Sequence, residues 1–176
     1  DGNRKDITYP SGEKETYENY DNDKLMRLIN LRADGTEMDN YYYTYDEAGN
    51  QITKYETING VDKGETIYTY DEMNRLETVT EPDTKVTEYS YDKAGNRESE
   101  TVKMDSTTIT EKIYGYNVQN RLSSVTSYVY GTLTETILYT YDANGNQLTS
   151  SIGGVIQVTN TYNLLNELVK TETRDR

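Results

Sequence analysis

A short tract, Tyr-x-Tyr followed by Asp or Asn, recurs at nearly constant spacing along the chain. Its five full copies have Thr, Ser or Gly in the middle and end at Tyr45, Tyr70, Tyr91, Tyr116 and Tyr141. Degenerate copies contain Tyr20 and Tyr162, so successive second tyrosines lie 25, 25, 21, 25, 25 and 21 residues apart. A period of about 20 to 50 residues indicates a repeat architecture. The sequence therefore predicts one array over residues 1–176, of about seven repeats with an incomplete copy at the N-terminus.

The residues after each tract alternate between two forms. One form is Gly-Asn and the other is Asn-Arg-Leu or Asn-Glu-Leu: Gly49-Asn50, Asn74-Arg75-Leu76, Gly95-Asn96, Asn120-Arg121-Leu122, Gly145-Asn146 and Asn166-Glu167-Leu168. An Asp side chain can accept hydrogen bonds from backbone amides further along a turn, and Gly or Asn tolerates positive φ. This chemistry predicts a short hairpin loop with a β-bulge after each tract. The aliphatic residue that follows (Ile52, Leu76, Leu122 or Leu148) starts the return strand.

Side chains of a strand alternate between two faces, so Tyr-x-Tyr puts both rings on one face. In the Tyr141 copy, Ile137 and Tyr139 share the face of Tyr141, and Leu138 takes the other. A second turn lies midway through each repeat, at Ala33-Asp34-Gly35, Asn59-Gly60, Glu81-Pro82-Asp83, Asp105-Ser106, Gly131-Thr132 and Gly153-Gly154. The fold class is therefore all-β, an antiparallel hairpin meander of about 13 to 15 strands that forms a curved, spiralling open sheet. A shorter second turn explains the 21-residue units.

Several places depart from the regular repeat, among them Glu98, which sits where an aliphatic residue is usual. Asn117 and Asn163 replace the Asp, and Thr161 stands in place of a first Tyr. The copy at Tyr20 is one residue short before Leu25. We expect local irregularity at these places.

Composition excludes several classes of function. The 31 Asp and Glu residues against 18 Lys and Arg give a net charge of −13, which disfavours a nucleic-acid partner. The chain has no Cys and no His, so disulfides, Cys zinc sites and histidine catalysis are all excluded. No apolar run reaches the ~18 residues of a membrane span. With 19 Tyr and no Phe or Trp, burial has to come from tyrosine rings.

The tract and its alternating tails resemble the YD repeat of the Rhs family, over roughly residues 17–170. In Rhs and teneurin-like proteins, such repeats form a β-sheet ribbon that spirals into a shell. In bacterial polymorphic toxins the shell encloses a toxic C-terminal cargo. The resemblance implies a partial shell here, belonging to a large secreted, cell-surface or wall-associated bacterial protein. Its partners would be the flanking domains or toxin cargo of the same polypeptide.

The candidate ligand-binding residues are the second tyrosines of the full copies, because a row of exposed rings can stack on sugars. They are Tyr45, Tyr70, Tyr91, Tyr116 and Tyr141. The competing interpretation is that these rings pack within the repeats. A calcium loop at Asp142–Asn146 is the weaker alternative to turn chemistry there. Arg75 and Arg121 are expected to form weak ion pairs with a neighbouring YD Asp.

No carboxylate pair stands out from the repeat pattern, so we expect no enzyme, no catalytic residue, no metal and no cofactor. The predicted function is architectural: a wall segment that encapsulates or displays another domain. The alternative is a Tyr-rich module that binds carbohydrate or cell-wall polymer. A further alternative is self-association through the exposed edges of the sheet.

Overall fold

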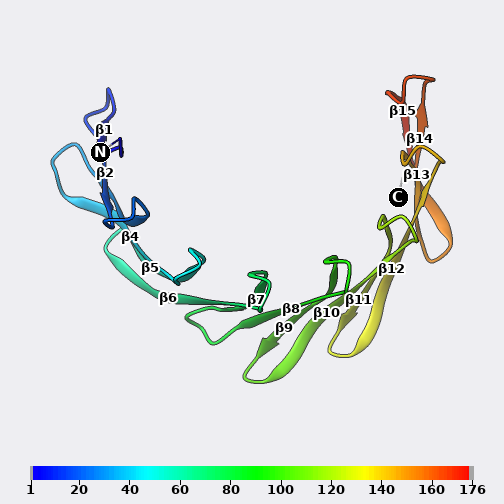
Figure 1. Cartoon of the computed structure of the whole chain (residues 1–176), viewed down its shortest axis with the longest axis horizontal. Helices are drawn as coiled ribbons and strands as arrows, with labels where there is room; N and C mark the ends of the chain where they lie inside the picture. The colour runs from blue at the N-terminus through cyan, green and yellow to red at the C-terminus, as the bar shows by residue number, and fades with distance from the viewer. Residues whose placement is uncertain (1, 175–176) are drawn as a thin grey trace. The chain divides into compact units, whose positions relative to one another are not determined.

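The structure, a computed structural model, describes residues 2–174, and none of those residues lies in a helix. Its fifteen strands follow one another in the sheet in chain order (Figure 1). They are β1 (Asp6–Thr8), β2 (Lys14–Asn19), β3 (Leu25–Leu31), β4 (Glu37–Tyr45), β5 (Gln51–Ile58), β6 (Val61–Tyr70), β7 (Leu76–Thr80), β8 (Val86–Tyr91), β9 (Arg97–Met104), β10 (Thr107–Tyr116), β11 (Leu122–Val129), β12 (Thr132–Tyr141), β13 (Gln147–Ile152), β14 (Val155–Tyr162) and β15 (Leu168–Thr173). The prediction of an all-β antiparallel meander is confirmed.

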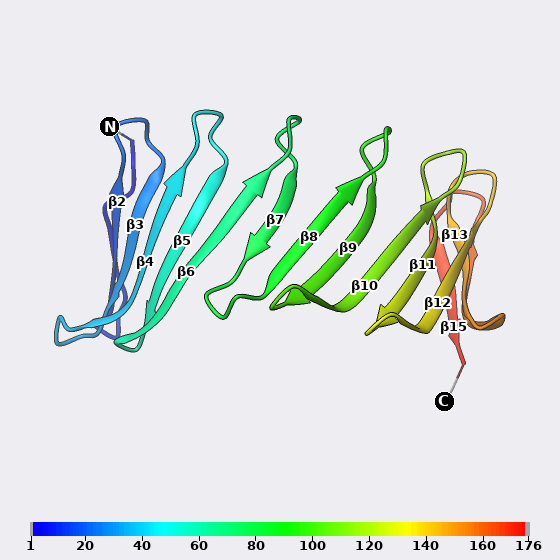
Figure 2. The same cartoon turned by 90° about the horizontal axis from the view of Figure 1, so that it is seen from below.

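The chain divides into two compact units, Asp1–Val86 and Thr87–Arg176. In the first unit each strand from β1 to β7 pairs antiparallel with the next. In the second unit the same holds from β9 to β15. Figure 2 shows the strands of each unit running side by side with loops at both ends. Each unit is thus a single sheet layer.

Neither unit has a hydrophobic core among the described residues. Thr66, at 8% exposure, is the one buried residue in residues 2–174, and no apolar side chain is buried there. The chain exposes 11586 Å², whereas a compact protein of 20.3 kDa exposes about 8800 Å². Most tyrosines are half-buried. Stability therefore rests on contacts between successive hairpins rather than on an interior.

Each Tyr-x-Tyr tract ends a strand and is followed by a five-residue turn, which we call the YD loop. The YD loops are residues 20–24, 46–50, 71–75, 92–96, 117–121, 142–146 and 163–167. The pairing register shifts beside the second Tyr, as at Thr44/Tyr45, where Ile52 is the extra residue of a β-bulge. The fourth loop residue has positive φ, for example Gly49 at 97° and Asn74 at 59°. The predicted hairpin loop with a bulge is confirmed.

The second turns are of two kinds, and their length does not explain the 21-residue units. Residues 59–60, 105–106, 130–131 and 153–154 form two-residue turns with positive φ at both positions, whereas residues 81–85 form a five-residue turn. The repeat from Tyr70 to Tyr91 is short because β7 and β8 have 5 and 6 residues, against 8 and 10 in β5 and β6. The prediction of a shorter second turn is wrong. The turn placed at Gly131-Thr132 is also one residue off, because Thr132 already begins β12.

The two degenerate copies are more regular than the sequence suggests. Asn19 pairs with Leu25 beside a bulge, as Tyr45 pairs with Gln51, so Tyr20 stands where other copies have Asp. The loop before Leu25 is therefore of full length, and the prediction of a missing residue is wrong. In the last copy Thr161 pairs with Lys170 as Thr44 pairs with Thr53. Thr161 is therefore the middle residue, and Asn160 replaces the first Tyr.

Within residues 2–174 there is no helix that could serve as a membrane span.

Candidate functional site

The second Tyr of the tract links each YD hairpin to the one before it. Its hydroxyl donates a hydrogen bond to the carbonyl oxygen of the first residue after the preceding YD loop. The bonds are Tyr45 to Leu25 (2.9 Å), Tyr70 to Gln51 (2.8 Å), Tyr116 to Arg97 (2.9 Å), Tyr141 to Leu122 (2.6 Å) and Tyr162 to Gln147 (3.1 Å). Each phenol has a single proton to donate, so a ligand would meet the ring rather than a free donor.

Burial is the main cause that raises the pKa of Tyr45, Tyr70, Tyr116 and Tyr141 above the ordinary value of a phenol. A raised pKa keeps the hydroxyl protonated, which the bond to the carbonyl requires. Tyr91 holds the same place in its hairpin and is half-buried. The structure thus gives the predicted ligand-binding tyrosines a structural contact, and sugar binding by them stays a prediction.

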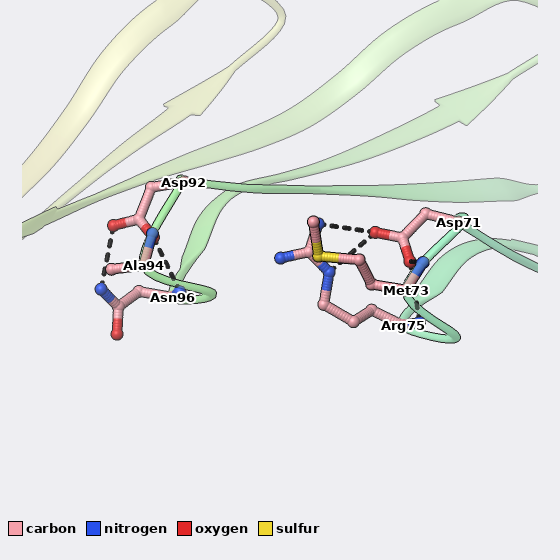
Figure 3. A network of polar contacts seen from close by, with 6 residues as sticks. All are labelled: Asp71, Met73, Arg75, Asp92, Ala94 and Asn96. Atoms are coloured by element: carbon pink, nitrogen blue, oxygen red, sulfur yellow. Dashed lines mark hydrogen bonds and ion pairs between the residues drawn. The ribbon is translucent and has the colours of Figure 1, made fainter.

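The YD Asp organises its own loop by accepting hydrogen bonds from the fourth residue after it. The Oδ1 atom of Asp92 accepts from the backbone amide of Asn96 at 2.8 Å, and Oδ2 accepts from the Asn96 side chain at 2.9 Å (Figure 3). Asp71 accepts from Arg75 instead: Oδ1 binds the Arg75 backbone amide at 2.9 Å, and Oδ2 binds the Arg75 guanidinium at 2.7 Å (Figure 3). The predicted ion pair of Arg75 therefore lies within its own loop.

These bonds hold the carboxylates in the charged form. The side-chain amides of Asn50, Asn96 and Asn146 are the leading cause that lowers the pKa of their loop Asp. For Asp71 the leading cause of the lowered pKa is the backbone amide of Arg75. The loop at Asp142–Asn146 therefore uses its carboxylate in the turn, with both oxygens bound by Asn146 at 2.9 and 2.8 Å.

Successive YD loops are joined in pairs through asparagine side chains. The Asn of a Gly-Asn loop donates to the side-chain oxygen of the positive-φ residue in the next loop. The bonds are Asn50 to Asn74 (2.9 Å), Asn96 to Asn120 (3.4 Å) and Asn146 to Asn166 (2.9 Å). Asn3 makes the same contact with Asp23 at 2.6 Å. The Asn in the second kind of loop is therefore required as an acceptor as well as for its backbone conformation.

A basic side chain from the preceding YD loop lies against the Gly of two Gly-Asn loops. Arg121 lies 4.9 Å from the ring centroid of Tyr141 in the next repeat and donates to the carbonyl of Asp142 at 3.2 Å. A Cβ atom on Gly145 would lie 3.2 Å from Nη1 of Arg121. Lys24 stands in the same way 5.1 Å from the Tyr45 ring, and 2.6 Å from where a Cβ on Gly49 would be. The predicted pair between Arg121 and an Asp is thus a contact with a backbone carbonyl.

A row of hydroxyl pairs on the opposite face from the tyrosines was missed in the sequence. The middle residue of the tract bonds to a Ser or Thr nine residues later: Thr44 to Thr53 (2.7 Å), Thr69 to Thr78 (2.8 Å), Ser90 to Ser99 (2.7 Å) and Thr140 to Thr149 (2.6 Å). Gly115 and Ser124 occupy the same positions without this bond. A spacing of nine between hydroxyl residues was the signal that could have revealed the row.

Charged groups lie among the first tyrosines of the ladder. Lys54 stands opposite Tyr43 across the strands and pairs with Glu56 at 3.0 Å. Arg97 lies 4.3 Å from the centroid of the Tyr89 ring. In the described part of the chain, no three acidic, His or Cys side chains are close enough together to hold a metal ion. The arrangement suits packing and contact with a polar surface, and a lack of enzymatic activity stays a prediction.

These observations define a class of protein: a tandem β-hairpin repeat in which tyrosine hydroxyls and loop asparagines link each hairpin to the next. Residues 45–86 match the family model described as RHS Repeat, which confirms over that segment the resemblance seen in the sequence. No curated protein matches the sequence at a significant level.

Solved structures share the fold. The Tc holotoxin pore of Photorhabdus luminescens, determined with a TccC3 mutant, matches 90% of this chain with a TM-score of 0.72 and 15% sequence identity. The chain covers 9% of that much longer toxin chain. A complex of TcdB2-TccC3 with Cdc42 matches 95% of this chain at a TM-score of 0.40 and 12% identity, and the chain covers 12% of it. At 15% identity, the likeness to the holotoxin pore concerns the fold alone.

Proposed function

We propose that this chain is an architectural segment of a large secreted or surface-associated bacterial protein. Its sheet forms part of the wall of a β-shell that encapsulates or displays another domain of the same polypeptide. The observation that carries the proposal is the repeated junction between hairpins, in which each Tyr hydroxyl binds the carbonyl of the hairpin before it. Such an array can be extended without changing any contact, as a wall requires.

Two further features support this role. Each unit is a single sheet layer, and no apolar side chain is buried within residues 2–174, so another part of an assembly has room to pack on the sheet. The fold is also shared with part of a Tc toxin chain about eleven times longer than the matched segment. In that comparison the toxin supplies an example of this sheet as a small part of a large protein.

The size of the native protein tests the proposal first. An antibody against residues 2–174 is used on cell, wall and culture fractions. A product many times larger than 20.3 kDa, in the wall or the medium, is expected. A native product of about 20.3 kDa would contradict the wall-segment role.

Lysine cross-linking of the intact native protein then tests whether the wall encloses something. Lys54 and Lys112 lie on the tyrosine face, whereas Lys103 lies on the opposite face with Glu88, 2.7 Å away. A shell predicts that lysines of one face cross-link to a segment outside the repeats and that those of the other face do not. Equal cross-linking from both faces, or none outside the repeats, would count against enclosure.

A second candidate function is binding of a glycan or wall polymer by the tyrosine face. A hollow of about 310 Å³ beside Tyr68, lined also by Lys54, Thr66 and Glu81, offers ring, hydroxyl and charged groups together. A glycan array with the wild-type chain tests this candidate. Tyr68→Phe keeps the ring and should keep a signal, whereas Tyr68→Ala should lose it with the fold intact by circular dichroism. An array without any signal rejects the candidate.

A further inference from the structure

Two tyrosine hydroxyls from different hairpins meet at the first YD loop. Tyr20 occupies the Asp position of its loop, so its side chain reaches the next hairpin instead of bonding within the loop. Its hydroxyl donates to the carbonyl oxygen of Tyr43 at 3.0 Å and lies 3.2 Å from the hydroxyl oxygen of Tyr42. Every other described YD loop begins with Asp or Asn. This phenol pair is therefore a product of the one loop that departs from the pattern.

Tyr42 is accessible from solvent. It precedes the first Tyr of its tract, so its ring lies on the face opposite the ladder, and it is 38% exposed. Its hydroxyl lies at the surface, 3.2 Å from the hydroxyl oxygen of Tyr20. A small oxidant or a radical at the protein surface can reach this ring.

The other rings near this pair are held by different partners. Tyr55 stands directly opposite Tyr42 across β4 and β5, but its hydroxyl bonds to Asp62, which is the main cause that raises the pKa of Tyr55. Tyr45 meets Tyr20 edge to face at 6.3 Å between ring centroids, and its hydroxyl is held by the carbonyl of Leu25. Tyr20 is thus the ring whose hydroxyl end faces that of Tyr42.

We propose that Tyr20 and Tyr42 form a dityrosine cross-link when the chain meets a one-electron oxidant, such as a haem peroxidase acting with hydrogen peroxide. Each phenol gives up one electron and one proton and becomes a tyrosyl radical. The two radicals couple through the ring carbons next to their oxygens, and a carbon–carbon bond forms. The ring hydrogens then move to the oxygens and restore both phenols. Hydrogen peroxide takes up the two electrons and two protons and is reduced to two molecules of water.

The cross-link gives this chain a covalent tie between repeats that a disulfide cannot supply. The chain has no Cys, so no disulfide can close a loop. The new bond would close the segment between residues 20 and 42 and restrict the unfolded chain as a disulfide does. In a sheet without a hydrophobic core, such a tie protects the first hairpins from opening. The inference rests on this geometry alone and is independent of the proposed wall function.

The test treats the folded chain at high dilution with peroxidase and hydrogen peroxide. The expected product is an intramolecular cross-link with dityrosine fluorescence, an intact mass lower by two hydrogen atoms, and a linked peptide pair that contains Tyr20 and Tyr42. Tyr42→Phe should lose this product while keeping the Tyr20 bond to the Tyr43 carbonyl. Tyr55→Phe and Tyr130→Phe are matched controls on exposed tyrosines, and both should retain it.

Three results would overturn the proposal. The first is an undiminished intramolecular product in Tyr42→Phe, with the fold verified by circular dichroism. The second is a dominant link between Tyr42 and Tyr55, or between Tyr20 and Tyr45, in the peptide map. The third is the same yield of the Tyr20–Tyr42 link from chain unfolded in urea, since the folded geometry would then have no part in the choice of partners.

Discussion

The last two YD loops make the same turn with opposite chemistry. In the loop at residues 142–146, a charged Asp142 accepts from the amide side chain of Asn146 at 2.8 Å. In the loop at 163–167 the roles are reversed, because Asn163 donates its side-chain amide to the carboxylate of Glu167 at 2.7 Å. Both first residues also accept a backbone hydrogen bond from the fifth loop residue.

The positive-φ position differs between the two loops as well. Gly145 has φ of 97° and lies against Arg121, whereas Asn166 has φ of 62° and accepts hydrogen bonds from Asn144 and Asn146. Gly145 therefore leaves space for a side chain of the preceding hairpin, whereas Asn166 accepts hydrogen bonds from the preceding hairpin. Both loops thus keep a hydrogen bond between their first and fifth residues. The carboxylate and the amide that make this bond exchange places between the two loops.

Acid should produce the largest difference between loops that begin with Asp, such as residues 142–146, and loops that begin with Asn, such as residues 163–167. The pKa values of Asp46, Asp71, Asp92 and Asp142 are lowered in the folded chain. Their contribution is complete above the unfolded pKa of about 3.9 and is lost as the pH falls through the lower folded values. Thermal unfolding followed between pH 7 and 3 should show stability falling in that acid range.

Asp142→Asn supplies the control for the acid prediction. It copies the neutral residue found at Asn163 and removes one titrating carboxyl, so the variant should lose less stability on acidification than the wild type. Nuclear magnetic resonance titration of the Asp142 carboxyl should give a pKa below the ordinary Asp value. A pKa at or above that value would contradict the role of the Asn146 bonds.

Exchange of the positive-φ residues should give the next largest effect. Gly145→Asn should lower the free energy of unfolding by about 1–3 kcal/mol, because a side chain at this φ is strained and meets Arg121. Asn166→Gly should cost less, about 1 kcal/mol, through its lost hydrogen bonds. Urea denaturation compares the two variants. Equal losses would mean that Arg121 does not select Gly at this place.

Removal of the junction hydroxyls should give a smaller difference. Tyr141→Phe should cost about 1 kcal/mol, because the carbonyl of Leu122 loses its side-chain donor. Tyr162→Phe should cost less, because Asn160 also donates to the carbonyl of Gln147, at 3.1 Å. Urea denaturation again measures both. The double variant Tyr162→Phe with Asn160→Ala should lose as much free energy of unfolding as Tyr141→Phe does. A loss no larger than the sum of two small single losses would refute the shared role.

The smallest expected change is a gain in stability at Gly115. Its backbone does not have positive φ, and it faces Ser124, where other hairpins have a hydroxyl pair. Gly115→Thr should raise the free energy of unfolding by about 0.5–1 kcal/mol once the Ser124 hydroxyl rotates away from the new side chain. Gly115→Ala gains strand preference without the pair and serves as the control. No gain of Thr over Ala would show that the hydroxyl pairs contribute nothing.

The alternation of faces and loops was open to prediction because each depends on residues close in sequence. Ile137 with Tyr139 on one face, and Leu138 exposed at 45% on the other, follow from the two-residue period of a strand. The turn chemistry of Asp46 and Gly49 is likewise local. The ends of the array were misread because Tyr20 was aligned by residue type, whereas the bulge that fixes its place depends on pairing between β2 and β3.

The sequence by itself determined the repeat, its hairpins, the short bulged loops after the tracts and the absence of disulfides, because these depend on composition and on spacing along one hairpin. Only the tertiary structure decided that Tyr141 binds the Leu122 carbonyl, that Asn146 reaches Asn166, and that Arg121 lies against Gly145. It alone also brought the hydroxyls of Tyr20 and Tyr42 together. The physical reason is that these contacts join residues about 20 positions apart, and their geometry is set by the register of hairpin on hairpin, which no local pattern specifies.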